Sequence, residues 1–172
     1  VYRLWGGFAE EIPVYASTGE LRSAEERIEY VRHCLERGIR AVKLRMHDPD
    51  PENDLDTIRE IRKTFGSSIK IMVDANQADR LPGAANMTSC WDLPTALKVA
   101  RALEALDVVW LEEPLARHNY DGLAALARKI DMPLAGGEKN TGLEEFRLLA
   151  EREGYHILQG DCVFSEGMFQ LR

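Results

Sequence analysis

The sequence predicts an α/β protein in which a parallel β-sheet is covered by helices, on two observations. First, six short apolar runs alternate with segments whose apolar residues recur at helical spacing. Second, charged side chains recur where these apolar runs end, about one strand and one helix apart. Alternating strands and helices form either an open doubly wound sheet or a closed barrel, and this pattern alone leaves both architectures open.

The predicted strands are short apolar runs, and the predicted helices fill the gaps between them. The strands cover 12–17, 39–44, 69–73, 108–111, 132–136 and 155–159. The helices are expected after Ser23, around 55–61, after Asp92, over 122–130 and from Thr141 to Gly154. A barrel of eight such units takes about 250 residues, so a barrel would be present here as about six of its eight units.

Three of the predicted helices carry clear start signals. Ser23 and Glu26 have the spacing of a capping box, in which each side chain accepts a hydrogen bond from the backbone N–H of the other residue. Thr141 and Glu144 repeat this spacing, so a second capping box is predicted at the last helix. Asp92 is a typical N-cap residue, and a proline follows it in the first turn.

The length and composition are those of one soluble globular domain. The chain has 172 residues, of which 45% are apolar and 30% charged. A net charge of −7 argues against a nucleic-acid or anionic-membrane surface, and no apolar stretch approaches the roughly 18 residues of a membrane span. Cys34, Cys90 and Cys162 are far apart and odd in number, which indicates free thiols in a reducing, cytoplasmic compartment.

The ends of the predicted strands gather the side chains that can perform chemistry. In chain order these are Lys43, Arg45, Asp74, Asn76, Glu112, Glu113, Glu138 and Asp161. The carboxyl ends of parallel strands meet at one end of the fold, so these side chains are expected to converge. Converging carboxylates repel one another unless a cation lies among them, and oxygen ligands without clustered His or Cys suit Mg²⁺.

The metal interpretation concerns three acids, Asp74, Glu112 and Glu138. Their neighbour Glu113 is expected to turn elsewhere, toward a cation of the facing strand. The alternative for each acid is that it solvates the sheet edge or caps the next helix. Three acids in register, one unit after the cations Lys43 and Arg45, favour the metal site over that alternative.

Together these segments resemble the enolase superfamily, and specifically its mandelate racemase-like branch. The motifs are VYAS at 14–17, AVKLR at 41–45, VDAN at 73–76, WLEEP at 110–114, GGE at 136–138 and ILQGD at 157–161. The resemblance implies a (β/α) TIM-type barrel preceded by an N-terminal capping domain. It also implies that residues 1–172 form a partial barrel domain, with the capping domain and the last barrel strands outside this chain.

The resemblance also implies roles for the residues at the strand ends. Asp74, Glu112 and Glu138 would bind Mg²⁺, with Mn²⁺ as an alternative ion. Lys43 falls on the first position of the family's Lys-x-Lys motif, at one face of the substrate. Asn76 would line the site near the metal and the substrate.

Asp161 falls on the aspartate that orients a catalytic histidine on the following strand in this branch, and that histidine would lie after Arg172. The muconate-cycloisomerase-like branch instead has a lysine at this strand end, and residues 160–162 contain none. Glu138 also stands where that branch prefers aspartate. Because members of the family assemble through their barrels, a homo-oligomer is expected.

The implied chemistry removes the proton α to a carboxylate and stabilises the resulting enediolate with a metal ion and nearby cations. Arg45 departs from the Lys-x-Lys motif, since arginine stays protonated and clamps a carboxylate better than it acts as a base. This departure favours dehydration of a sugar acid to a 2-keto-3-deoxy acid, a carbon–oxygen lyase reaction. With Lys43 as a second base, a racemase or epimerase of a 2-hydroxy acid is the alternative, and a non-catalytic metal-binding fragment is another.

The segment 77–91 is longer than most loops that connect a strand to a helix. Because it follows the third strand, we expect it to lie over the barrel mouth and to shape the substrate pocket, with Arg80 and Trp91 as candidate contacts. The alternative is a solvated surface insertion. His118 follows the WLEEP motif, and a surface role is expected for it, with a place at the rim of the site as the alternative.

Overall fold

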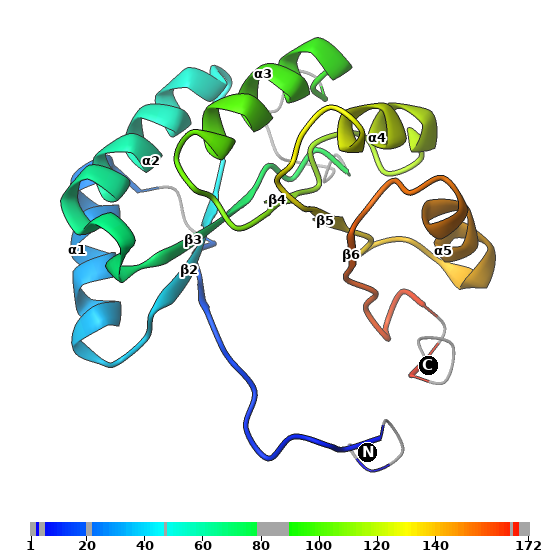
Figure 1. Ribbon diagram of the computed structural model, residues 1–172, viewed down its shortest axis with the longest axis horizontal. Helices are drawn as coiled ribbons and strands as arrows, with labels where there is room; N and C mark the ends of the chain where they lie inside the picture. Colours follow the sequence, from blue (N-terminus) through cyan, green and yellow to red (C-terminus); the bar gives the residue numbers. More distant parts are fainter. Residues whose placement is uncertain are drawn as a thin grey trace.

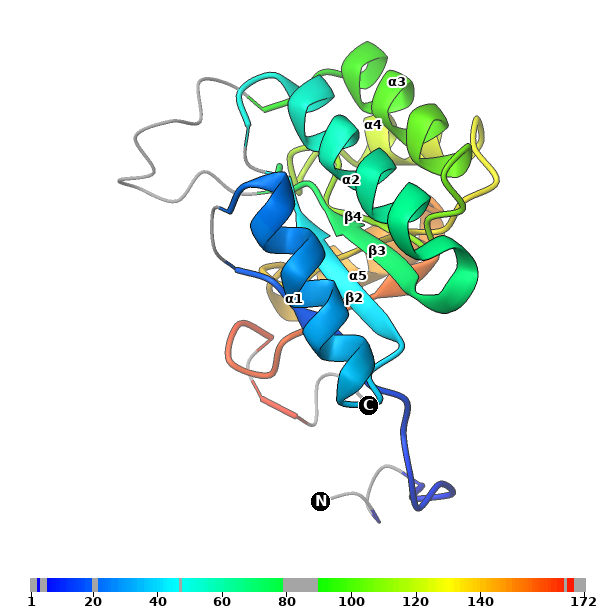
Figure 2. The ribbon, with the colours of Figure 1, turned by 90° about the vertical axis from the view of Figure 1, so that its left-hand side faces the viewer.

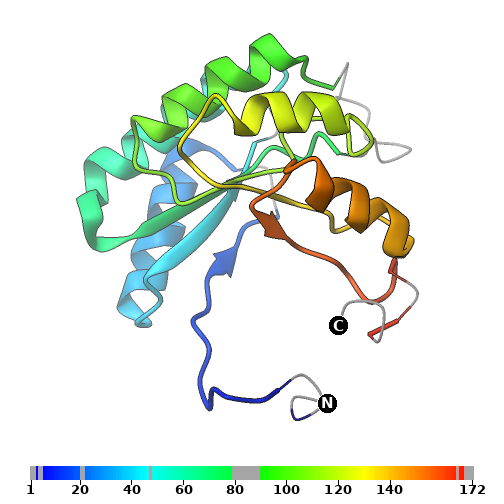
Figure 3. The ribbon, with the colours of Figure 1, turned by 45° about the vertical axis from the view of Figure 1, so that its right-hand side comes forward.

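The structure is a computed structural model that describes residues 3, 6–19, 22–46, 48–78, 90–165 and 167–168. Within this part of the chain, six parallel strands form one sheet in the order β1-β2-β3-β4-β5-β6, so each strand pairs with the next one in sequence. The α-helices lie on one face of the sheet, and the sheet curves around its other face (Figure 1, Figure 3). A doubly wound sheet has helices on both faces, so this single helical layer identifies the fold as part of an α/β barrel.

The strands are short. They are β1 Ala16–Ser17, β2 Ala41–Arg45, β3 Lys70–Asp74, β4 Leu111–Glu112, β5 Leu134–Gly136 and β6 Ile157–Leu158. The first predicted strand, 12–17, is paired only at its last two residues, where Ala16 and Ser17 lie opposite β2. The other predicted strands begin too early, because apolar residues such as Ile69 and Val108 are buried in the core ahead of the paired segment.

The helices alternate with the strands as predicted. They are α1 Ala24–Glu36, α2 Pro51–Phe65, α3 Leu93–Glu104, α4 Tyr120–Ala127 and α5 Gly142–Glu151, with a 3₁₀ turn, η2 Gly66–Ser68, after α2. Figure 2 shows α1 and α2 side by side over β2 and β3. The first capping box is confirmed, since the Ser23 N–H donates to Glu26 Oε2 over 2.8 Å and the Glu26 N–H to Ser23 Oγ over 3.2 Å. Asp92 caps α3 by accepting a hydrogen bond from the Thr95 N–H.

The second predicted capping box is wrong. Thr141 is the N-cap residue of α5, but its side chain accepts no capping hydrogen bond. The Glu144 carboxylate instead pairs with Arg147 on the exposed side of the helix. The next residue, Glu145, accepts the hydrogen bond of the Thr141 N–H over 3.0 Å. The backbone N–H of the N-cap residue is thus hydrogen-bonded to a glutamate one residue further along than the capping-box pattern indicates.

The core lies between the sheet and the helices. Its members include Val42, Leu44, Leu55, Ile61, Ile71, Val73, Leu103, Leu111, Leu123 and Leu134. Successive side chains of a strand point to opposite faces, so the burial of Val42 and Leu44 among these residues directs Lys43 to the inner face of the sheet. Among the described residues, no helix has both the length and the apolar character needed to cross a bilayer.

Candidate active site

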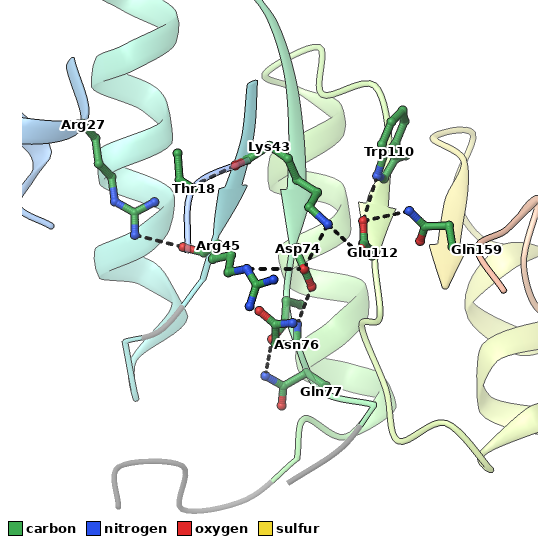
Figure 4. Close-up of polar contacts among 11 residues, drawn as sticks. Thr18, Arg27, Lys43, Arg45, Asp74, Asn76, Gln77, Trp110, Glu112 and Gln159 are labelled. Carbon is green, nitrogen blue, oxygen red and sulfur yellow. Dashed lines mark hydrogen bonds and ion pairs between the residues drawn. The ribbon is translucent and has the colours of Figure 1, made fainter. Parts of the chain in front are cut away.

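The carboxyl ends of β2, β3 and β4 place their charged residues side by side. In the sheet register Arg45 lies opposite Asp74, and Asp74 lies opposite Glu112. Figure 4 shows these side chains with Lys43 between the two acids. The parallel arrangement therefore produces the convergence that the sequence predicts for these four residues.

Lys43 is the positive partner of the two acids. Its Nζ lies 2.7 Å from Glu112 Oε1 and 3.4 Å from Asp74 Oδ2, and the side chain is buried. Burial opposes the ammonium charge, but the hydrogen bond to Glu112 and the charge of Asp74 prevail and raise the pKa of Lys43 above its ordinary value. Lys43 is therefore a cation at neutral pH in this arrangement.

Glu112 is held by two further donors. Gln159 Nε2 donates to Glu112 Oε2 over 3.1 Å, and Trp110 Nε1 approaches the same oxygen at 3.4 Å. Both residues lie in the sequence motifs, but neither was predicted to have a role in the site. Neither carries a charge, so the charge pattern along the strand ends gives no signal that would find them.

Asp74 combines one satisfied oxygen with one that accepts no hydrogen bond. Its Oδ1 accepts a hydrogen bond from the Asn76 N–H over 3.0 Å, while Oδ2 lies 3.8 Å from Arg45 Nε. Burial raises the pKa of Asp74 to about 6, the charge of Glu112 adds to this effect, and the cations Lys43 and Arg45 oppose it. Asn76 itself has a φ of 50°, and its buried Oδ1 has no hydrogen-bond partner.

Glu113 is buried beside the same acids, and the charge of Lys139, which follows the neighbouring strand β5, also acts on it and lowers its pKa. Its side chain is buried, its backbone φ is 47°, and its Oε1 has no hydrogen-bond partner. Burial raises the pKa of Glu113 to about 7, and the charges of Asp74 and Glu138 raise it further.

Glu138 lies in the turn that follows β5, and its charge acts on Glu113. Within the described residues, no group of three His, Cys, Asp or Glu side chains is arranged as a metal site. The structure thus brings Asp74 and Glu112 together, and the role of Glu138 as a third ligand stays a prediction.

The chemistry of the donor atoms nevertheless fits a hard cation. Among the described residues, four buried oxygens at these strand ends accept no hydrogen bond, namely Asp74 Oδ2, Asn76 Oδ1, Glu113 Oε1 and Gln159 Oε1. Of these, Asp74 Oδ2 lies within 4 Å of the cations Lys43 and Arg45. Buried polar atoms normally have partners, so the other three oxygens indicate a missing cation or hydrogen-bond donor. Carboxylate and amide oxygens are the ligands that Mg²⁺ prefers.

Asp161 lies after β6, where its Oδ1 accepts a hydrogen bond from the Val163 N–H over 2.7 Å. Its predicted role toward a histidine stays a prediction. The predicted loop contact Arg80 lies outside the described residues. Trp91 packs against the hydrophobic core, and its backbone N–H donates to Oε1 of the buried Gln77 over 2.9 Å. Gln77, which the sequence analysis overlooked, thereby anchors the end of the long loop.

The fold and the strand-end residues define a protein of the α/β-barrel class. The chain belongs to the enolase C-terminal domain-like family, which it matches over residues 26–172. This places it among the mandelate racemase-like enzymes of the enolase superfamily and confirms the resemblance seen in the sequence.

Individual relatives agree with this assignment. L-talarate/galactarate dehydratase of Salmonella typhimurium is 28% identical over 162 residues, which cover 93% of this chain and 38% of the relative. 3,6-anhydro-α-L-galactonate cycloisomerase of Streptomyces coelicolor is 32% identical, with 85% of this chain and 37% of the relative covered. Racemases and epimerases also occur among the relatives.

Solved structures show the same fold. L-talarate dehydratase from Polaromonas sp. JS666, crystallised with Mg and L-glucarate, superposes with a TM-score of 0.85 at 30% identity. The match covers 98% of this chain and 44% of that protein. The chain therefore spans about two fifths of the length of the proteins it matches.

Proposed function

We propose that this chain is the metal-binding part of an enzyme that removes the proton α to a carboxylate and dehydrates a sugar acid to a 2-keto-3-deoxy acid. The observation that carries the proposal is the cluster at the carboxyl ends of β2, β3 and β4. There Lys43 forms ion pairs with Asp74 and Glu112, and nearby buried oxygens accept no hydrogen bond from the described residues. Two of the similar proteins are named as sugar-acid dehydratases.

Asp74, Glu112 and Glu138 would hold the metal, which we propose to be Mg²⁺, with Mn²⁺ as an alternative. When bound, the ion supplies Lewis-acid stabilisation of the negative charge that develops on the substrate carboxylate. The crystallised Polaromonas protein was solved with Mg, which supports this choice of ion. Asp74 Oδ2 accepts no hydrogen bond from the described residues, and Lys43 and Arg45 are its neighbouring cations.

The two cations on β2 would act on the substrate as charges rather than as bases. Arg45 stays protonated at any physiological pH and suits the clamping of a carboxylate. Lys43 lies beside both acids with its ammonium group on the inner face of the sheet, so we propose that it too binds the substrate anion. Proton transfer would then take place on the opposite face, through the histidine that the family resemblance predicts beside Asp161.

A reaction on one face is sufficient for dehydration. One acid–base group can take the α-proton and then assist departure of the β-hydroxyl, whereas racemisation needs a group on each face. The racemases among the relatives keep a racemase or epimerase as the second candidate. In that case Lys43 would have to act as the base on the second face.

The product formed in D₂O separates these reactions. We expect the full-length protein, incubated with Mg²⁺ and a panel of sugar acids, to form a 2-keto-3-deoxy acid that NMR detects. An Asp74→Asn variant is the control and should form no product, because it removes a charged ligand. An epimer that carries solvent deuterium, without any keto acid, would refute dehydration and establish the alternative.

A further inference from the structure

The predicted third metal ligand, Glu138, lies in a turn that a backbone hydrogen bond closes and that contains a glycine with positive φ. The Asn140 N–H donates to the Gly137 carbonyl oxygen over 3.1 Å, which closes the turn around Glu138. Gly137 has a φ of +105°, and a Cβ there would lie 3.2 Å from the Phe146 ring. This turn therefore requires glycine at its first position and packs directly on α5.

On the α5 side, the Glu145 carboxylate accepts hydrogen bonds from this turn. Its Oε2 accepts hydrogen bonds from Asn140 Nδ2 over 2.7 Å and from the Thr141 N–H over 3.0 Å. Its Oε1 lies 3.2 Å from His118 Nε2. Partial burial opposes the charge of Glu145, but the hydrogen bonds from Thr141, Asn140 and His118 prevail and lower its pKa.

From the opposite side, Arg117 holds the same turn. Its side-chain Nη1 donates to the Lys139 carbonyl oxygen over 2.8 Å, and its backbone N–H donates to the Ala78 carbonyl oxygen over 3.2 Å. Arg117 lies after β4 and Ala78 lies after β3. The segments that follow the three strands bearing the predicted ligands are therefore joined by hydrogen bonds.

A purely structural role for Glu145 would be to cap α5. That role accounts for its bond to Thr141, but it does not require Asn140 or His118, which lie outside the helix. Asn140 is almost fully buried, so its side-chain amide needs the partner that Glu145 provides. The carboxylate thus serves the turn as well as the helix.

We propose that Glu145 is a positioning residue that, with Asn140 and Arg117, fixes the turn so that Glu138 can reach the metal. This inference rests on the proposed function, because it assumes that Glu138 is a ligand. Residues that orient metal ligands typically change metal affinity or activity by about 10- to 100-fold when they are removed.

The adjacent residue Glu144 provides a matched control. It is a carboxylate in the same helical turn, but its ion pair is with Arg147 on the exposed surface. Titration calorimetry of the full-length protein with Mg²⁺ alone should give a Kd about 10- to 100-fold higher for Glu145→Ala. Glu144→Ala should bind as wild type does, and Glu145→Gln should recover most of the affinity, because it keeps one acceptor oxygen.

Arg117→Met releases the turn from its other side and gives a second variant if Glu145→Ala does not fold. It should also weaken Mg²⁺ binding. Wild-type affinity in folded Glu145→Ala, or equal losses in the Glu144 and Glu145 variants, would overturn the inference while leaving the proposed function intact. If the wild-type protein takes up no Mg²⁺, the proposed function and this inference both fail.

Discussion

At the scale of single residues, the two adjacent acids after the apolar segment of β4, Glu112 and Glu113, have different polar partners. Glu112 receives the ammonium of Lys43 together with Gln159 Nε2. Glu113 has one oxygen without a partner, and its pKa is raised to about 7 by burial and by the neighbouring acids. Glu112 therefore keeps its charge beside a cation, while burial and the neighbouring acids disfavour the charged form of Glu113.

A second residue-scale constraint lies at the end of β5, where Gly136 touches Tyr155. A Cβ on Gly136 would lie 2.4 Å from the buried Tyr155 ring. Because the ring is enclosed by the core, Gly136→Ala should lower the free energy of unfolding by about 1–3 kcal/mol, as overpacking does. Urea denaturation at neutral pH measures this change.

Gly19→Ala is the matched control, since a Cβ there meets nothing within 4 Å. It should change the stability by no more than about 0.5 kcal/mol. Replacing Tyr155 with leucine in the Gly136→Ala background should recover part of the loss, because the two sites are in contact. Unchanged stability in Gly136→Ala would contradict the close approach.

At the scale of the elements, α3 is joined to the segment before β5 through its last residue. Glu104 accepts hydrogen bonds from the Asp131 and Met132 N–H groups and from Arg101 Nη1. Partial burial opposes the charge of Glu104, but these donors prevail, so its pKa lies below the ordinary value of 4.5. A lowered pKa in the folded state stabilises the fold above that ordinary value, and this contribution is lost as the pH falls through the folded-state pKa.

Glu104→Gln should therefore lower the free energy of unfolding by about 1–2 kcal/mol at pH 7, since hydrogen bonds to a charged group are lost. The difference from wild type should shrink below about pH 4.5, where wild type loses the same contribution. Denaturant titrations at several pH values test this. Glu60→Gln, which removes an exposed pair with Lys63, should show neither effect. A pH-independent difference would contradict the assignment.

At the scale of the whole molecule, the described sheet has two edges, at β1 and β6, and apolar side chains are exposed near both. They are Ile12, Val14, Leu158, Val163 and Phe164. A curved sheet of this class closes when its last strands meet its first. We propose that further polypeptide provides the remaining units, since this chain spans about two fifths of its relatives.

Intact mass spectrometry of the native protein checks this proposal directly. We expect a mass well above the 19.5 kDa of these 172 residues. A native mass of 19.5 kDa would contradict it, and the barrel could then be completed only by another chain. Activity assays on the same sample show whether the longer form turns over sugar acids.

Much of the site could be predicted from the sequence because its residues follow strands. Lys43, Arg45, Asp74 and Glu112 meet in the structure as the strand order requires. Gln159 was not predicted, because it carries no charge and its hydrogen bond to Glu112 crosses from the end of β6 to β4, with β5 between them. The boundaries of β1 were also wrong, because pairing depends on where the neighbouring strand lies rather than on apolar character.

The sequence by itself determined the alternation of strands and helices, the residues at each strand end and the family, since these depend on local pattern and order along the chain. Only the tertiary structure decided which atoms meet. Lys43 reaches Glu112 across 69 residues of sequence, and Glu145 rather than Glu144 holds the start of α5. Such contacts depend on register, side-chain rotamer and the packing of distant segments, and local pattern does not encode them.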